Sequence, residues 1–330
     1  MITLAQAKVG MSDKVDQQVI DIFRRESILL DQLVFDDAVS PGTGGSTLTY
    51  GYVRMKTPAT AGFRAINTEY TAQVADREKF TVDLKIFGGA FEIDRVIADT
   101  SGAVDEVDFQ LQEKIKAARN LFHYTVINGD SAVDSLAFDG LDKALINSST
   151  EKNTESYIDL SDSAAVDTNY KIFLDLLDDF LSDLNGKPNF LMGNSKLMTR
   201  IKAVARRAGY LTASEDAFGR KVDSYDGIPL LDLGYFTDIS EGTPVETPVV
   251  PIVGRTIGEN PLTGLTDLYA PVINLAGFHG VTVTGNSIIR TFLPDFNIPG
   301  AVKKGEVEMI GAVALKNTRA AGVLRNIKVQ

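Results

Sequence analysis

The longest helical pattern in this chain is AVDEVDFQLQEKIKAARNLFHYTVI, residues 103–127, which Asn128-Gly129 follows directly. Its apolar residues recur three or four positions apart, so they form one continuous stripe on the 3.6-residue period of a helix. The stripe consists of Val104, Val107, Leu111, Ile115, Ala118, Phe122 and Val126. Because each residue adds 1.5 Å, the predicted helix is about 36 Å long, which suits a strut better than part of a catalytic pocket.

Both ends of this helix carry capping signals. Ser101 is the predicted N-cap, because its hydroxyl can accept a hydrogen bond from a backbone N–H of the first turn. Gly129 is the predicted stop, in the left-handed conformation that glycine adopts easily. A short acidic turn and the tetrapeptide Phe138-Asp139-Gly140-Leu141 come next.

Composition narrows the class of protein. The chain has 330 residues, of which 44% are hydrophobic, and no run approaches the ~20 apolar residues of a membrane span. Cysteine is absent, which excludes disulfides, thiolate metal sites and cysteine nucleophiles. The net charge of -11 disfavours a nucleic-acid-reading role, because binding of phosphates needs clustered Lys and Arg. The N-terminal residues show no secretory signal pattern.

The first third of the chain is predicted to hold a helix and two strands around a long loop. The helix covers residues 13–33, and the strands cover 47–54 and 80–86, where apolar and polar residues alternate. The connection 55–78 greatly exceeds the usual 2–5 residues of a hairpin. Such a loop is a lid, a disordered segment or an arm that becomes ordered on a partner. Gly88-Gly89 is predicted to end the second strand.

Two helices with a short strand between them are predicted in the middle of the chain. The helices cover 168–184 and 196–208, the strand covers 189–192, and Gly209 stops the second helix. Residues 210–264 are predicted to be largely irregular. Further strands are expected at 230–233, 268–274, 279–284, 288–292, 306–315 and 323–329. Because β-rich segments flank a helical middle, we predict an α+β fold in which one domain is inserted into another.

No motif for catalysis or cofactor binding stands out. The sequence lacks a phosphate-binding loop, a dinucleotide-binding glycine pattern, a nucleophile elbow and a His-Glu-x-x-His zinc motif. The two histidines, His123 and His279, are isolated and fit partly buried helix and strand positions better than a metal site. We therefore expect no enzyme activity, no catalytic, cofactor-binding or metal-binding residues and no cofactor.

Three charged clusters have simpler explanations than chemistry. One cluster lies on the polar face of a predicted helix and comprises Asp175, Asp178 and Asp179. Another departs from the spacing of a calcium loop and lacks its closing Glu; it comprises Asp130, Asp134 and Asp139. The third forms a solvated or subunit-contacting face of the helix over 196–208, and comprises Lys196, Arg200, Lys202, Arg206 and Arg207.

The order of these parts resembles a known family. A helix, a long two-stranded loop, a long helix ending in Asn128-Gly129-Asp130, the turn Phe138-Asp139-Gly140-Leu141, an α/β insertion and returning strands follow one another. This order is similar to that of tailed-bacteriophage major capsid proteins with the Hong Kong 97 (HK97-like) fold. The resemblance covers nearly the whole chain. It implies a structural subunit that self-assembles into an icosahedral head shell around double-stranded DNA.

The resemblance also implies how the chain is divided. Residues 1–45 would be an N-terminal arm and helix, and 46–90 an extension loop that lies across a neighbouring subunit. Residues 91–163 and 287–330 would form the peripheral domain, with the long helix as its spine. Residues 164–286 would form the axial domain at the centres of hexamers and pentamers.

Contacts between subunits follow from this division. If the apolar stripe packs on the subunit's own sheet, Glu113, Lys116 and Asn120 are expected to be free for the shell surface or a neighbour. The candidate subunit-interface residues are Arg54, Lys56, Arg64, Glu113, Lys116, Arg200, Arg206 and Arg207. Lys56 and Asn317 have the residue types that some family members cross-link, but so do many other residues here, and we predict no cross-link.

The implied partners are copies of the same chain, a separate scaffold protein, a portal, a decoration protein and packaged DNA bound without sequence specificity, with no membrane. The implied location is the virion capsid, assembled in the host cytoplasm. One alternative is the shell protein of an encapsulin-type bacterial nanocompartment, which shares this fold. Another is a soluble hydrolase or binding protein, which would need a convergent site that the sequence does not reveal.

Overall fold

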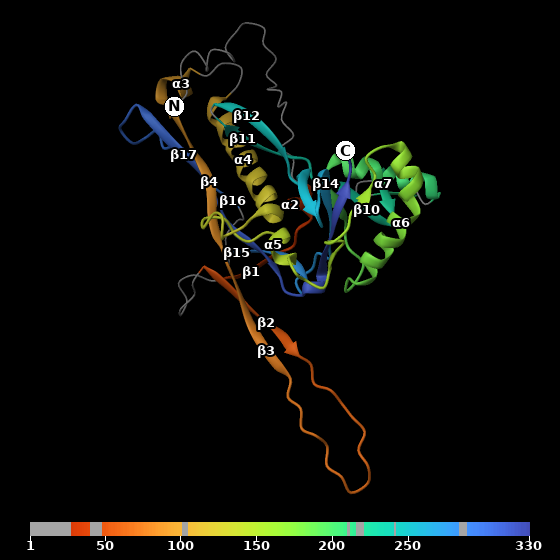
Figure 1. The fold of residues 1–330 in the computed structure, drawn as a ribbon. Helices are drawn as coiled ribbons and strands as arrows, with labels where there is room; N and C mark the ends of the chain where they lie inside the picture. The colour runs from red at the N-terminus through yellow and green to blue at the C-terminus, as the bar shows by residue number, and fades with distance from the viewer. Residues whose placement is uncertain are drawn as a thin grey trace.

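Two β-sheets form the framework of the molecule, and the helix α4 (Glu106–Asn128) packs along the long strands of one of them (Figure 1). This computed structural model describes residues 28–39, 48–100, 105–209, 212–215, 221–240, 242–283 and 289–330. The five-stranded sheet has the order β1-β15-β17-β16, and β4 also pairs with β17. Its strands are β1 (Phe35–Val39), β4 (Lys85–Asp94), β15 (Phe278–Val283), β16 (Ile289–Phe292) and β17 (Val302–Leu315).

The nine-stranded sheet has the order β5-β18-β14-β7-β10-β9-β8, with β13 on β14 and β6 on β18. Its strands are β5 (Glu151–Lys152), β6 (Ile158–Asp159), β7 (Leu191–Gly193), β8 (Thr212–Glu215), β9 (Lys221–Tyr225), β10 (Ile228–Asp232), β13 (Val253–Ile257), β14 (Asn260–Pro271) and β18 (Ala321–Lys328). The helices α6 (Ser163–Ser182) and α7 (Ser195–Ala208) pack beside it (Figure 1). The 3-10 helix η2 (Thr318–Ala320) leads from β17 into β18.

The helix α4 (Glu106–Asn128) packs along β4 and β17 (Figure 1). The predicted stripe is confirmed: Ala118, Phe122 and Val126 are buried, and Leu111 and Ile115 pack against the same core. The Phe122 ring lies in the middle of this contact, next to aromatic rings from the sheet and from the turn after the helix. The helix is therefore held by its sequence pattern and by aromatic packing on the subunit's own sheet.

The start of α4 differs from the prediction. The helix begins directly after Asp105, whose side chain accepts hydrogen bonds from the backbone N–H groups of Val107 (2.9 Å) and Asp108 (3.2 Å). Ser101, the predicted N-cap, and Val104 lie outside the described residues. Asp is as good an N-cap as Ser, so the helix is capped four residues after the predicted position.

Gly129 ends α4 for a different reason than predicted. Its φ of -60° and ψ of 133° are extended, not left-handed. A Cβ at this position would lie 2.2 Å from the carbonyl oxygen of Phe138 and 2.6 Å from that of Thr125. The backbone N–H of Gly140 donates to the Gly129 oxygen at 2.8 Å. Glycine is needed here because the turn after the helix folds back against its last residues.

Replacing Gly129 with Ala tests this explanation. We expect Gly129→Ala to lower the free energy of unfolding by about 1–3 kcal/mol, because the new methyl group forces the backbone apart. Gly62→Ala is the control, since nothing lies within 4 Å of its added Cβ. Urea unfolding of both variants measures the effect. Equal midpoints for the two variants would contradict the close approach.

The prediction that Gly88-Gly89 ends a strand is wrong. The expected strand 80–86 is the end of β3 (Asp76–Asp83) followed by the beginning of β4, which continues to Asp94. Along this length β4 pairs with β17. A Cβ on Gly88 would lie 2.0 Å from the carbonyl oxygen of Val307, so glycine lets the two strands approach rather than breaking the strand.

In the middle of the chain α7 agrees with the prediction, whereas α6 starts five residues early. The side chain of Asp162 caps α6 by accepting from the Ala165 N–H at 2.8 Å. Asn194 caps α7, and Gly209 ends it with a φ of 77°. The expected strand 230–233 is confirmed as β10 (Ile228–Asp232), but the prediction that the rest of 210–264 is largely irregular is wrong. That range holds β8, β9, β10, β13, the start of β14 and the hairpin of β11 (Tyr235–Ser240) and β12 (Thr243–Pro248).

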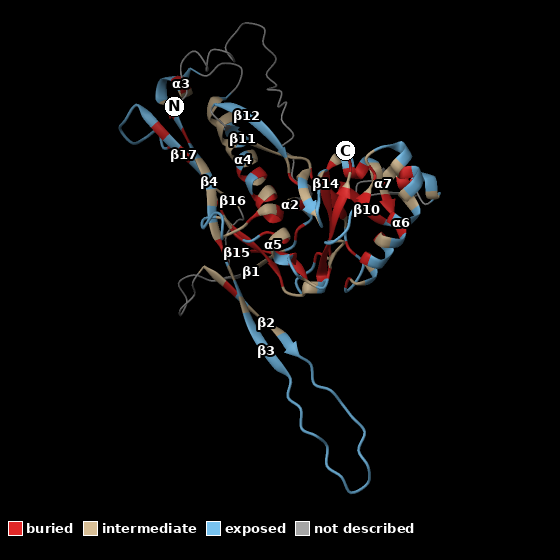
Figure 2. Ribbon diagram, in the orientation of Figure 1, coloured by how far each residue is buried: buried red, intermediate tan, exposed pale blue. Residues whose placement is uncertain are grey.

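The two-stranded arm of β2 (Thr49–Thr57) and β3 projects away from both sheets (Figure 1). Its connection, residues 58–75, is exposed throughout (Figure 2). The predicted long loop is therefore confirmed, with strands that reach a few residues further. Of the predicted helix 13–33 only its end is described, as α2 (Ile28–Gln32). The remaining short helices are α3 (Arg95–Asp99) and α5 (Leu141–Leu145). Within the described ranges, no helix is long and apolar enough to cross a membrane.

Candidate interaction surfaces

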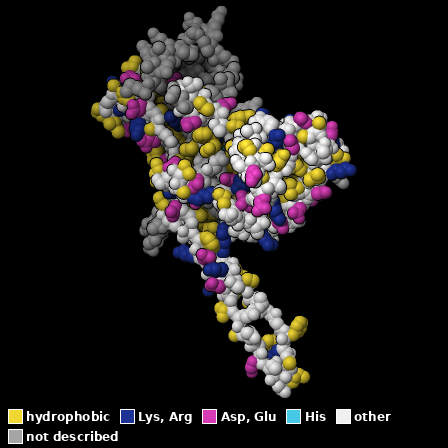
Figure 3. All heavy atoms as spheres, in the orientation of Figure 1, with side chains coloured by type: hydrophobic (Ala, Val, Ile, Leu, Met, Phe, Trp, Pro, Cys, Tyr) yellow, Lys and Arg dark blue, Asp and Glu magenta, His cyan; other side chains and the backbone are white. Residues whose placement is uncertain are grey.

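The tip of the arm presents apolar side chains to solvent. The exposed fractions are 109% for Phe63, 89% for Ile66 and 85% for Val74. Tyr70 is also exposed, and its ring lies 5.3 Å from the guanidinium of Arg64. Figure 3 shows such apolar groups scattered along the arm, well away from the body of the molecule. Several large apolar groups on one projecting loop are typical of a surface that another chain covers.

The predicted interface residues of the arm are placed differently from one another. Lys56 is exposed on β2, and Arg64 lies in the exposed tip, where it donates to the Thr68 carbonyl at 3.2 Å. Arg54 instead binds its own chain: its Nε donates to the carbonyl oxygen of Lys316 at 2.8 Å. Lys56 and Arg64 are thus open to a neighbour, whereas Arg54 belongs to the base of the arm.

On α4 the structure separates the three residues expected to be free. Glu113 and Lys116 form a partly exposed ion pair of 3.1 Å. Asn120 is buried, which contradicts the expectation. With its amide oriented to satisfy both groups, it donates to the Tyr235 carbonyl (3.2 Å) and accepts from the Thr237 N–H (3.0 Å). The β11–β12 hairpin covers this side of the helix, a contact that the helical period alone could not predict.

Most basic side chains of α7 form hydrogen bonds or ion pairs with other residues of the same chain. Arg200 donates to the Ser161 carbonyl, and Arg207 pairs with Asp167. Lys202 pairs with Asp223 at 2.7 Å, and Lys196 bonds Gln330. Arg206 is exposed. Among the three arginines of α7 that were predicted to contact another subunit, Arg206 is therefore the one that points to solvent without a described partner.

The remaining candidate groups have structural roles. His123 is buried, its Nε2 lies 2.7 Å from the Leu233 carbonyl oxygen, and burial lowers its pKa. His279 is buried in β15, where burial also lowers its pKa. Asp130 and Asp139 both bind Lys143, at 2.6 and 2.9 Å.

The acidic cluster of α6 lies on its solvent-exposed face. Asp175, Asp178 and Asp179 are exposed, as predicted, and Asp178 accepts a hydrogen bond from the Tyr225 hydroxyl at 2.6 Å. No group of three or more His, Cys, Asp or Glu side chains in the described residues is arranged to hold a metal ion.

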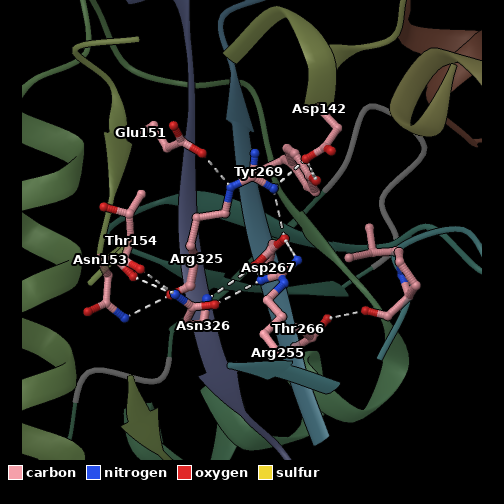
Figure 4. Close-up of polar contacts among 12 residues, drawn as sticks. Asp142, Glu151, Asn153, Thr154, Arg255, Thr266, Asp267, Tyr269, Arg325 and Asn326 are labelled. Carbon is pink, nitrogen blue, oxygen red and sulfur yellow. Dashed lines mark hydrogen bonds and ion pairs between the residues drawn. The ribbon is translucent and has the colours of Figure 1, made fainter. Parts of the chain in front are cut away.

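The sequence did not reveal a buried polar cluster, here called the Arg325 network, on β14 and β18 (Figure 4). Its members are Asp142, Glu151, Asn153, Thr154, Arg255, Asp267, Tyr269, Arg325 and Asn326. The guanidinium of Arg325 binds Glu151 at 2.8 Å, Asp267 at 2.9 Å, and Asp142. The one available signal was a charged residue within each of two strongly apolar strands. The network connects the strands to segment 142–154.

Opposite charges are paired within this network. Arg255 holds Asp267 by two hydrogen bonds of 2.6 Å each. Burial alone would raise the pKa of Asp267, but the hydrogen bonds and positive charges of Arg255 and Arg325 outweigh it and keep that pKa below its usual value. Burial raises the pKa of Tyr269, whose hydroxyl donates to Asp142 at 2.7 Å. Paired in this way, the charges serve structure rather than acid–base chemistry.

The depressed pKa of Asp267 gives a pH-dependent contribution to stability. A carboxyl whose folded pKa is below its unfolded value of about 3.9 stabilises fully above that value, and the effect is lost as pH falls through the folded pKa. The stability difference between the native chain and Asp267→Asn should therefore be constant from neutral pH to about pH 5 and shrink below about pH 4. Urea midpoints across this range measure it. A difference that grows on acidification would contradict the assignment.

A second apolar surface lies where β17 begins, at the tip of the five-stranded sheet (Figure 3). Its exposed members are Val96, Phe292, Leu293, Ile298 and Val302. They come from α3, β16, the following loop and β17, so the sheet gathers residues that are far apart in sequence.

Comparisons with known proteins show which solved structures share this architecture. No protein-family model and no curated protein sequence matches the chain. Solved structures match it over nearly its full length. The encapsulin of the holo-SrpI complex from Synechococcus elongatus PCC 7942 has a TM-score of 0.63 and 16% identity, covering 100% of this chain and 97% of that one. The capsid of the native GTA particle has a TM-score of 0.58 and 12% identity, covering 96% and 95%.

The capsid of Myoviridae phage XM1 agrees equally well in extent, with a TM-score of 0.56 and 10% identity over 99% of both chains. The chain has the HK97-like fold. The predicted α+β architecture is thereby confirmed, including the long spine helix α4 and the projecting arm. At such low identity the backbone match shows that the fold is shared, but it does not transfer the roles of individual residues to this chain.

Proposed function

We propose that this chain is a major capsid protein, a structural subunit that self-assembles into the icosahedral head shell of a tailed phage. The observation that supports this best is the arm, whose residues 58–75 are exposed while carrying Phe63, Ile66 and Val74. An HK97-like subunit with such an arm has a surface that a second copy can bury. The role is structural and involves no catalytic turnover.

The predicted domains are part of this proposal, with two adjustments supported by strand pairing. Residues 46–90 supply the extension arm, and 91–163 with β16 and β17 supply the peripheral domain around α4. β15 pairs with β17, so we assign it to the peripheral domain. β18 pairs with β14, so we assign it to the axial domain with α6 and α7.

The proposed partners follow from the same role. Copies of the chain would form hexamers and pentamers, assisted by a separate scaffold protein, with a portal and a decoration protein completing the head. The net charge of -11 favours packaged DNA that is enclosed rather than bound in a sequence-specific way. We propose the virion capsid as the location, with assembly in the host cytoplasm.

The alternative is an encapsulin-type bacterial nanocompartment shell. The SrpI encapsulin matches 100% of this chain, which is the observation that favours it. Both proposals predict closed shells, and the contents distinguish them. A phage head encloses nucleic acid, whereas a nanocompartment encloses a cargo enzyme.

Electron microscopy of the purified chain, expressed with and without its neighbouring structural genes, tests the proposal. We expect closed particles of uniform diameter, and a monomer under every condition would contradict both shell proposals. Nuclease-protected DNA inside particles from the native source supports the phage head. A single co-purifying enzyme instead supports the nanocompartment.

A further inference from the structure

The base of the arm is attached to the body by one face of β2. Tyr50, Tyr52 and Arg54 alternate along the strand and therefore point to the same side. Tyr50 is buried, and its hydroxyl donates to Asp36 at 2.7 Å. The Tyr52 hydroxyl donates to the Leu315 carbonyl at 3.1 Å.

Arg54 makes the outermost of these contacts. Its Nε donates to the Lys316 carbonyl at 2.8 Å, and its terminal nitrogen donates to that of Leu315. The guanidinium also lies 4.3 Å from the centre of the Phe80 ring and 5.3 Å from that of Tyr52. A planar cation that donates two hydrogen bonds while it stacks on a ring is held in one orientation, which Lys could not reproduce.

The two carbonyl groups that accept these hydrogen bonds lie at the junction between the two sheets. Leu315 is the last residue of β17, and Ala321 is the first residue of β18. β17 belongs to the five-stranded sheet and β18 to the nine-stranded sheet. Arg54 therefore donates its hydrogen bonds to the start of the short connection between the two sheets. From Met55 onward to Lys79, every residue of the arm is exposed.

We propose that Arg54 is a positioning residue that fixes the direction of the arm and ties it to the connection between the two sheets. The arm then turns together with that connection whenever the sheets shift against each other. The consequence for shell geometry rests on the proposed function. The direction of the arm, however, is a property of the isolated subunit and can be measured without assembly.

Single-molecule FRET on the full chain measures this direction. The chain has no cysteine, so Thr57→Cys on the arm and Ala117→Cys on α4 provide the only two thiols for dyes. Both positions are exposed. Single-molecule dilution keeps the subunit unassembled. Arg54→Ala and Arg54→Lys are the test variants, and Arg77→Ala, on the same arm but with an exposed side chain, is the matched control.

We expect a narrow FRET distribution for the native sequence and for Arg77→Ala, and a broadened, shifted one for both Arg54 variants. If Arg54→Ala does not fold, Arg54→Lys alone decides, because it retains the charge and most of the stem. A native distribution in the Arg54 variants, or equal broadening in Arg77→Ala, would overturn the proposal. If the native chain forms no shells but Arg54 variants still broaden, the proposed function fails while the role of Arg54 stands.

Discussion

Joining Thr57 to Asp76 through an Asn-Gly turn, in place of residues 58–75, is expected to give a folded subunit that forms no shells. Thr57 and Asp76 pair across the arm, and Asn-Gly is the preferred two-residue turn of a hairpin. Each halving of loop length lowers the cost of loop closure by about 0.6 kcal/mol, so the shortened chain should be at least as stable as the native one. It loses the apolar tip that a neighbour would cover.

Electron microscopy and thermal unfolding of the shortened chain check the two halves of this prediction. A matched control keeps the length of the segment but replaces residues 58–75 with Gly and Ser. It should also fail to assemble, because the contacts of Phe63 and Ile66 are gone, and so would show that apolar contact rather than reach is required. Normal shells from the shortened chain would show that the arm has no role in assembly.

The sequence predicted elements whose stability is local. The stripe of α4 and the end of α7 at Gly209 are set by residues within a few positions of one another, so period and capping rules were sufficient. The length of the predicted connection 55–78 likewise identified the arm. For these elements each local preference agrees with the overall fold.

Elements that depend on distant chain segments escaped prediction. Gly129 and Gly88 resemble terminators locally, but each admits a close approach by a segment from elsewhere in the fold. Asn120 is polar and looks solvent-exposed on a helical wheel, yet the β11–β12 hairpin buries it. Arg54 looked like a free arm residue because its acceptors, the carbonyls of Leu315 and Lys316, are far along the chain.

Replacing Asp267 with Ala is expected to lower the free energy of unfolding by about 3–5 kcal/mol, the usual cost of removing one partner from a buried ion pair. Asp267 is 4% exposed and accepts hydrogen bonds from both Arg255 and Arg325. Its removal leaves two guanidinium groups without their shared anion inside the sheet. Thermal or urea unfolding measures the loss, and Asp175→Ala on the exposed face of α6 is the control, expected to be nearly neutral.

A combined replacement distinguishes the net contribution of the network to stability from the destabilisation caused by removing a single partner. Replacing Arg255 and Arg325 with Met and Asp267 with Leu removes all three charges at once, so neither guanidinium is left without its shared anion. Because such apolar replacements are often neutral or stabilising, the triple variant should regain most of the stability that Asp267→Ala loses. Asp142 would lose Arg325 at little cost because its side chain is 38% exposed, whereas Glu151 is 11% exposed and would keep the hydrogen bond from the Asn147 N–H. If the triple variant is less stable than Asp267→Ala, the charges themselves, and not merely their balance, hold β14 and β18 to the segment 142–154.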